Sequence, residues 1–269
     1  FYAILFLSLV SLASAFKVSA VVNDQNGAPI SGATVSLKFT YTSDISSVPE
    51  ERTALDKTNV EGKYASFGYY LGGSPSIKTC SLTVEYYSAK DTQPCESPSG
   101  LDVSKTIVLN LFKLDSTAKD TKGRLLSDVG VDATGDNGFS KTIKTDATGK
   151  ASFVQLPQGS YTIVMTRGAD KNQQVVKVDK DSTSELQLPG FDLTISVTDE
   201  KASPLSGTVI SVASNSVYSK SLNSETDGKA VFESIPTGKA TVTSAYKSFS
   251  ASKEIQLSAD ASEEFVFDF

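Results

Sequence analysis

Apolar and polar residues alternate along most of the chain after residue 16. The alternation is clear in the segments 161–165, 193–197 and 240–242, where every second residue is apolar. A period of two is typical of a β-strand with one buried face and one face in water. Because no stretch beyond the N-terminal segment keeps a helical period, the pattern predicts an all-β protein.

Turn sequences separate the alternating runs. Asn-Gly or Asp-Gly pairs stand at 26–27, 137–138 and 227–228. Asn, Asp and Gly tolerate the positive φ angles of tight hairpins, so these pairs predict turns between adjacent strands. The Leu-Pro-Gln-Gly and Ile-Pro-Thr-Gly sequences at 156–159 and 235–238 each predict the end of one strand and the start of the next, since proline removes a donor from the ladder and glycine permits the return turn.

The chain contains an internal repeat. Two segments, 120–164 and 199–243, share five landmarks displaced by 79 residues, namely Asp120 and Asp199, Gly149 and Gly228, Phe153 and Phe232, Pro157 and Pro236, and Gly159 and Gly238. A longer copy begins at Asn23 and carries insertions near 42–54 and 67–80. One constant spacing across several landmarks indicates a duplicated domain.

The repeat and the alternation together predict the fold. We expect three tandem Ig-like antiparallel β-sandwich domains, each with roughly seven short strands. Their expected bounds are 17–113, 114–190 and 191–269. A hydrophobic N-terminal segment of residues 1–16, expected to be helical, precedes them.

A set of turn and core residues recurs in the three copies. They are Asp24, Gly27, Pro29, Gly32 and Val35 in the first, Asp146, Gly149, Phe153, Pro157, Gly159 and Tyr161 in the second, and Asp199, Pro204, Gly207, Asp227, Gly228, Phe232, Pro236 and Gly238 in the third. This set resembles the carboxypeptidase regulatory-like and collagen-adhesin B-type (prealbumin-like) sandwich domains of exported surface proteins. The resemblance spans 17–269 and implies the sandwich fold and a non-catalytic protein, but turn and core positions specify function only weakly.

The adhesin members of that group carry a Lys two positions before the first-turn Asp. The Lys forms an isopeptide bond with an Asn, helped by a Glu in a later strand. Here Val22, Ala118 and Val197 occupy the Lys positions, and Met165 and Ser244 occupy the Glu position. The resemblance therefore implies no isopeptide bond in these copies.

The segment 1–16 is apolar and has no charged residue. As a helix its first 15 residues would rise about 22 Å, less than the roughly 30 Å of a bilayer core. The small-x-small sequence at 13–15 fits a secretory signal that is cleaved. Alternatively, pilin-like processing before the apolar stretch would retain it as an assembly helix, and a conventional membrane anchor is a third interpretation. The residues expected to drive polymerisation are Phe1, Ile4, Leu5, Leu7, Leu9, Val10 and Leu12.

Cys80 and Cys95 are the two cysteines of the chain. All three interpretations of the N-terminus export the protein, and in an oxidising compartment two cysteines at this separation predict one disulfide. Closing a loop of this length stabilises a fold by about 3 kcal/mol. Two cysteines without histidine make a poor metal site.

Composition excludes several functions. The 269 residues include no histidine, so Ser-His-Asp and Cys-His nucleophiles and His-ligated metals cannot be built. A net charge of −6, from 25 basic and 31 acidic residues, is unfavourable for binding phosphates. We expect no enzyme activity, no cofactor and no nucleic-acid partner, with membrane contact only during export or assembly.

Tyrosines gather in the first copy. Neighbouring residues of a strand face opposite sides, so one member of each pair, Tyr69 with Tyr70 and Tyr86 with Tyr87, is expected to point outward. These four residues form a candidate contact surface for a protein or a glycan, with core packing as the alternative. Acidic turns such as those at Asp24 and Asp146 lack the spacing of a calcium loop, and we expect them to cap hairpins instead.

Together these observations favour a non-enzymatic, extracellular or cell-surface structural protein. The leading hypothesis is a subunit of a pilus-like filament that self-associates into a homopolymer through its hydrophobic N-terminus. The alternative is a secreted monomeric adhesin or ligand-binding module whose N-terminal segment, 1–16, is a cleaved signal. An accessory domain of a larger sugar- or peptide-processing assembly is a third interpretation.

Overall fold

The computed structural model describes residues 15–42, 47–65, 69–70, 76–95, 102–214 and 217–268. These residues form 22 strands and no helix, which confirms the all-β prediction. The chain divides into two compact units, one of residues 1–112 and 155–158, the other of 113–154 and 159–269. The expected N-terminal helix lies outside the described residues. The first strand begins at Ala15, inside the segment expected to precede the first domain.

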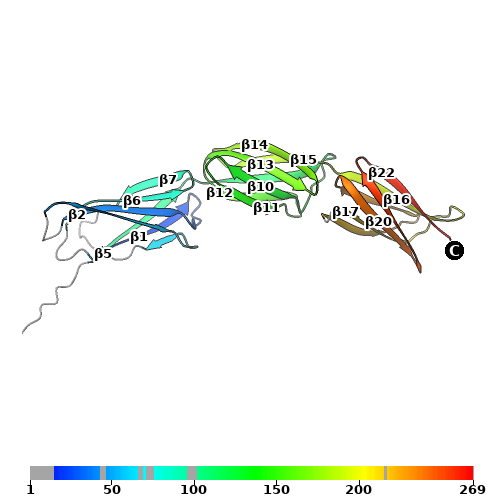
Figure 1. The fold of residues 1–269 in the computed structure, drawn as a ribbon, viewed down its shortest axis with the longest axis horizontal. Helices are drawn as coiled ribbons and strands as arrows, with labels where there is room; N and C mark the ends of the chain where they lie inside the picture. The colour runs from blue at the N-terminus through cyan, green and yellow to red at the C-terminus, as the bar shows by residue number, and fades with distance from the viewer. Residues whose placement is uncertain are drawn as a thin grey trace, which may run out of the picture. The chain divides into compact units, whose positions relative to one another are not determined.

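The first sandwich contains eight strands (Figure 1), which are β1 (Ala15–Asp24), β2 (Thr34–Thr42), β3 (Glu50–Lys57), β4 (Lys63–Ala65), β5 (Tyr69–Tyr70), β6 (Ser76–Tyr86), β7 (Ala89–Pro94) and β8 (Asp102–Leu109). One sheet has the order β3-β2-β6-β7. In the other layer β1 pairs with β4, β5 and β8. The buried side chains of β2, such as Val35, Leu37 and Phe39, alternate with more exposed ones, as the sequence predicts.

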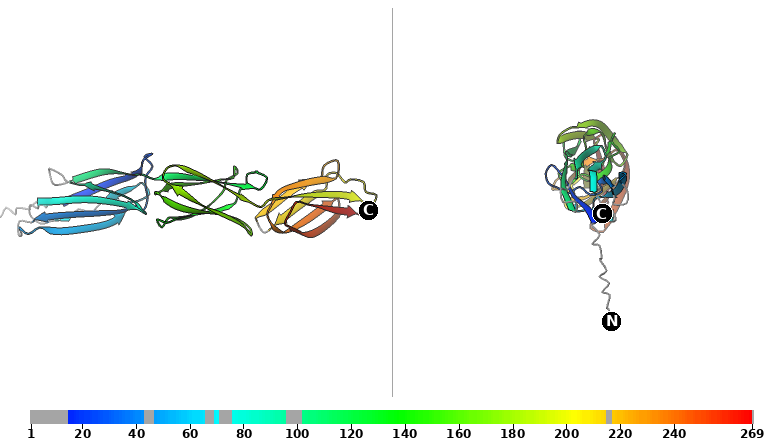
Figure 2. Two further views of the ribbon diagram at one scale, coloured as in Figure 1. Left: turned by 90° about the horizontal axis from the view of Figure 1, so that it is seen from above. Right: turned by 90° about the vertical axis from the view of Figure 1, so that its left-hand side faces the viewer.

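The second sandwich contains seven strands, which are β9 (Phe112–Asp120), β10 (Gly130–Gly135), β11 (Ser140–Lys144), β12 (Lys150–Leu156), β13 (Gly159–Arg167), β14 (Asp170–Val178) and β15 (Ser182–Leu188). Its sheets have the orders β12-β9-β15 and β11-β10-β13-β14, and Figure 2 shows them from two further directions. Tyr161, Ile163 and Met165 of β13 are fully buried.

The third sandwich repeats this plan with β16 (Phe191–Asp199), β17 (Val209–Ser214), β18 (Tyr218–Asn223), β19 (Lys229–Ile235), β20 (Gly238–Tyr246), β21 (Phe249–Leu257) and β22 (Ala261–Phe267). The orders β19-β16-β22 and β18-β17-β20-β21 match those of the second sandwich strand for strand. The duplication inferred from the 79-residue spacing is therefore also a duplication of topology.

The first and last strands of each sandwich are parallel neighbours. Strand β1 pairs in parallel with β8, β9 with β15, and β16 with β22. The other strand pairs among the described residues, such as β1 with β4 and β2 with β6, are antiparallel. The turns predicted around Pro157 and Pro236 are present, since β12 and β19 end one residue before the proline and the next strand begins two residues after it.

Candidate functional site: a charged junction in the second unit

The residues predicted to act in polymerisation, Phe1 to Leu12, lie outside the described residues. So do the side chains of Tyr69 and Tyr70, although their backbone forms β5 and pairs with Phe16 and Ala15 of β1. The contact surface of the four tyrosines therefore stays a prediction.

Tyr86 and Tyr87 are described in full. Tyr86 is half-buried and packs against the core of the first sandwich, whereas Tyr87 is 42% exposed. Their rings meet edge to face, with centroids 4.8 Å apart. Burial raises the pKa of the Tyr86 hydroxyl, with a smaller contribution from Tyr87. One ring of this pair thus faces the core and the other faces outward.

Cys80 and Cys95 are joined by a disulfide, with Cα atoms 5.0 Å apart. The bond connects β6 to the residue after β7, and the Cys95 N–H donates to the Cys80 carbonyl at 3.1 Å. Both cysteines are buried. The bridge therefore ties an edge of the first sandwich to its core.

The first-turn aspartates make the same contacts in all three sandwiches. In Asp24, Asp120 and Asp199, Oδ1 accepts backbone N–H bonds of 2.8–2.9 Å from the second and fourth residues that follow. This arrangement is the expected Asx cap, and it occupies the oxygen that would otherwise be offered to a cation. Among the described residues, no group of three or more acidic or cysteine side chains could hold a metal ion.

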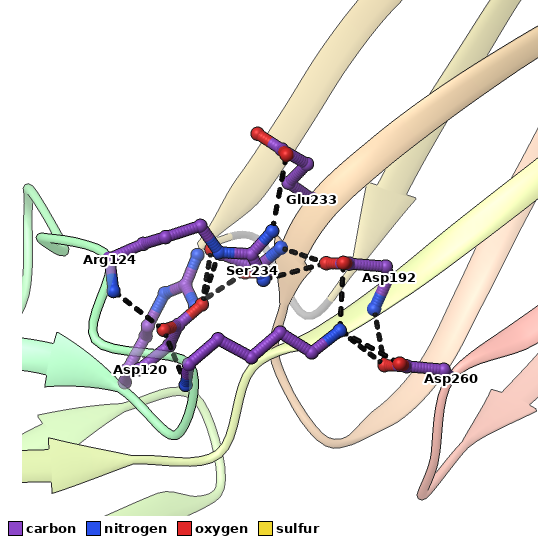
Figure 3. A network of polar contacts seen from close by, with 8 residues as sticks. Asp120, Arg124, Asp192, Glu233, Ser234 and Asp260 are labelled. Atoms are coloured by element: carbon purple, nitrogen blue, oxygen red, sulfur yellow. Dashed lines mark hydrogen bonds and ion pairs between the residues drawn. The ribbon is translucent and has the colours of Figure 1, made fainter.

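Asp120 differs from the other two because its second oxygen accepts short hydrogen bonds from two side chains (Figure 3). Asp120 is fully buried, and its Oδ2 accepts hydrogen bonds from Arg124 Nε at 2.7 Å and from Ser234 Oγ at 2.8 Å. Arg124 belongs to the turn after β9, whereas Ser234 belongs to β19 of the third sandwich. The turn of one sandwich is thus bonded directly to a strand of the next.

Arg124 makes further ion pairs in the same network. Its Nη2 donates to Asp192 Oδ1 at 2.6 Å, and its Nη1 lies 3.3 Å from Glu233 Oε1. The hydrogen bond to Asp192 raises the pKa of Arg124 above its ordinary value, and the bond to Asp120 adds to this effect. The guanidinium therefore keeps its charge at every accessible pH.

Lys122 extends the network to a fourth carboxylate, that of Asp260. Its Nζ lies 2.7 Å from Asp192 Oδ2 and 2.8 Å from Asp260 Oδ2. Both bonds raise the pKa of Lys122, and the bond to Asp192 has the larger effect. Burial on its own would raise the pKa of Asp192, but the hydrogen bonds from Arg124 and Lys122 outweigh it and lower that pKa to about 2.

The backbone of the connection between β15 and β16 also lies close to the side chain of Asp120. A Cβ added at Gly190, in the connection between β15 and β16, would lie 2.7 Å from the Cβ of the buried Asp120. Ser234 has a φ of +56°, as Gln155 at the matching position has +58°. The Ser234 carbonyl accepts a 2.6 Å hydrogen bond from Arg167, so this strained residue contacts the second sandwich through both side chain and backbone.

We name the set Asp120, Lys122, Arg124, Asp192, Glu233, Ser234 and Asp260 the charged junction. Its carboxylates accept hydrogen bonds from fixed cations, and the pKa values of Asp120, Asp192 and Asp260 lie below the ordinary range. For Asp120, burial opposes this lowering, and the hydrogen bonds from Ser234 and Arg124 outweigh it. Groups held fully ionised and paired are poor proton donors or acceptors near neutral pH, so the site fits a connecting role.

No family model matches the chain. The resemblance to carboxypeptidase regulatory-like and collagen-adhesin domains therefore stays an expectation.

No helix among the described residues has the length and apolar character needed to cross a bilayer.

Several solved structures are similar to this chain at low sequence identity. The Bacillus anthracis TIE protein matches with 14% identity and a TM-score of 0.30, over 95% of this chain and 50% of its own. A streptococcal ancillary pilin matches with 13% identity and a TM-score of 0.32, over 93% of this chain and 98% of its own. The shaft pilin SpaA of Lactobacillus rhamnosus GG matches with 12% identity and a TM-score of 0.34, over 65% and 98%.

This chain spans about half the length of the TIE protein, the first of these similar structures. Because the three TM-scores lie below 0.5, we base the proposed function on the chain's own residues and contacts.

The sequence analysis missed the charged junction, although one signal was present. Where the second copy has Lys122 and Arg124 in its first turn, the third has Lys201 and Ser203 at the positions 79 residues later. A departure from an otherwise repeated turn marks a residue with a role of its own. Asp192 lies 68 residues from its partner Arg124, and Asp260 lies 138 residues from its partner Lys122, so sequence spacing could not identify these pairs.

Proposed function

We propose that this protein is a non-enzymatic, exported structural protein, a subunit of an extracellular pilus-like filament. In this proposal the hydrophobic segment 1–16 joins copies of the chain into a homopolymer, and the sandwiches are displayed at the cell surface. Membrane contact is limited to export and assembly.

The observation that carries the proposal is the charged junction. Buried and half-buried charges are costly unless they are paired with good geometry. Here Arg124 and Lys122 contact Asp120, Asp192 and Asp260 at 2.6–2.8 Å, across two sandwiches of one unit. Such pairing supports a chain whose function is to keep its domains connected, rather than one that presents reactive groups to a substrate.

The N-terminal residues support self-association. Six side chains of this segment are apolar, namely Ile4, Leu5, Leu7, Leu9, Val10 and Leu12. Burying each of them between subunits would contribute about 1.5–3 kcal/mol before entropic costs. The cumulative gain favours a bundle of such segments from several copies.

The N-terminus of the native protein tests this proposal. Mass spectrometry of material sheared from cells should find the segment 1–16 still attached to the sandwiches. Finding Phe16 or Lys17 as the first residue would contradict polymerisation through this segment.

A specific observation favours a second candidate, a secreted monomeric adhesin or ligand-binding module. Strand β1 begins at Ala15, the last residue of the small-x-small sequence 13–15, so cleavage after Ala15 would leave a chain that starts at Phe16, inside its first strand. In this case the partner is a cell-surface or glycan ligand, and Tyr87 is an exposed aromatic candidate for contacting it. A monomer in analytical ultracentrifugation of the secreted form would support this candidate, whereas fibres would contradict it.

A further inference from the structure

A polar cavity of about 820 Å³ opens within the second unit and borders the charged junction, because Glu233 and Ser234 of the junction are among its lining residues. Its walls come from the loop after β9, the end of β13, and strands β17, β18, β19 and β20. Ten of its fourteen lining residues are polar or charged. The volume lies within the range of small-molecule sites, and the lining suits a hydrophilic ligand better than an apolar one.

Arg167 is the central charge of this cavity. It is only 8% exposed, and among the described residues its one hydrogen bond runs from Nη1 to the Ser234 carbonyl. A guanidinium has five N–H donors, so most of them are left for another acceptor. The nearest acidic neighbour, Asp170, lies beyond ion-pair distance and uses Oδ2 to accept the Thr237 N–H at 2.9 Å.

The other charges that line the cavity are already paired. Lys239 lies 2.6 Å from Glu254, Asp128 lies 3.5 Å from Lys144, and Glu233 lies 3.3 Å from Arg124. Within the described part of the chain no carboxylate forms an ion pair with Arg167, although Asp170 and, more weakly, Asp120 interact with it electrostatically. A buried cation without a close counter-charge is unusual, because buried charges are normally paired.

Tyr218 also lines this cavity and carries an unused donor. Its hydroxyl is buried and has no hydrogen-bond partner among the described residues. Burial raises the pKa of Tyr218 to about 12, so the hydroxyl stays protonated and can donate. Arg167 interacts electrostatically with this hydroxyl, which shows that the two groups lie near each other.

We infer that this cavity binds a small carboxylated sugar, whose carboxylate accepts hydrogen bonds from Arg167 and Tyr218. A planar guanidinium matches a carboxylate with two parallel bonds. The hydroxyls of Ser127 and Ser219 also line the cavity and can exchange hydrogen bonds with sugar hydroxyls. The few apolar lining residues offer little surface for an apolar ligand.

Titration calorimetry of the full chain with D-glucuronate tests this inference, with D-glucose as the matched neutral probe. Glucuronate should bind saturably with a Kd of about 1 mM or lower, and glucose at least about tenfold more weakly. Equal binding of both sugars would overturn the inference, as would the absence of glucuronate binding up to about 10 mM. Binding of an Asp-Glu dipeptide without binding of glucuronate would overturn the assignment of a sugar.

Two variants locate the binding. Tyr218→Phe removes a hydroxyl that has no partner, so the melting temperature should stay unchanged while glucuronate binding weakens about three- to tenfold. Arg167→Gln should weaken it at least about tenfold. Arg52→Gln, a matched loss of an exposed cation in the first unit, should bind glucuronate like the wild type. If Tyr218→Phe is folded and binds as tightly as Arg52→Gln, the inference is wrong.

Discussion

Replacing Arg124 by Met removes the cation that connects the charged junction. The hydrogen bonds to Asp120 and Asp192 are charge-assisted and each contributes about 1.5–3 kcal/mol. The contact with Glu233, which is 57% exposed, adds little. Asp120 stays buried and keeps its bond from Ser234, which limits the penalty. We therefore expect Arg124→Met to destabilise the second unit by about 2–4 kcal/mol.

Scanning calorimetry of the full chain measures this effect. A loss of this size should lower the unfolding temperature of the second unit by roughly 5–15 °C. Amide exchange at Asp192, whose N–H donates to Asp260 at 2.9 Å, should also accelerate. The control is Arg52→Met, since Arg52 lies 3.6 Å from Glu50 with both side chains about half exposed or more. That variant should change stability by less than about 0.5 kcal/mol.

The reasoning would be refuted if Arg124→Met lowered the unfolding temperature no more than Arg52→Met does.

The acid dependence of stability provides an independent check on the contact between Arg124 and Asp192. The pKa of Asp192 is about 2 in the folded protein and about 3.9 when unfolded. Its contribution to stability is therefore fully present above about pH 4 and is lost as the pH falls through about 2. In Arg124→Met this loss should be smaller, and an unchanged acid transition would argue against the assigned pairing.

Other predictions concern the connection and the disulfide. Gly190→Ala should destabilise the second unit by about 1–3 kcal/mol in chemical denaturation, because the added Cβ would lie 2.7 Å from the Cβ of Asp120. The control Gly130→Ala should have almost no effect, because the nearest atom to its added Cβ lies 3.6 Å away. Reducing the Cys80–Cys95 bond should lower the stability of the first unit by about 3 kcal/mol and leave the second unchanged in calorimetry. The double variant with serine at both positions should not respond to the reductant, and a shift of the second unit's transition would contradict this prediction.

The alternating segments were enough to predict the strands that form the core. In β16 the residues Leu193, Ile195 and Val197 alternate with polar ones, and all three are fully buried. Strands β3, β11 and β18 carry no such signal, because most of their side chains are exposed and packing does not select apolar residues there. Periodicity identifies strands only where one face is buried.

The pairing of the strands and the contacts of the charged junction could not be predicted from the sequence. Parallel pairing of the first and last strand depends on contacts between residues far apart in the chain, such as Leu193 with Ala261. The charged junction depends on Gly190 allowing close approach and on Arg124 reaching Asp192 across two domains. Repetition in sequence reveals what the copies share, whereas a contact between copies depends on the positions where they differ.

Electron microscopy of the purified chain tests the central claim most directly. The chain that retains residues 1–16 should form fibres, and a chain that begins at Ala15, the first residue of β1, should remain as single particles of the same folded sandwiches. Single particles from both chains, or fibres from both, would contradict assembly through the N-terminal segment.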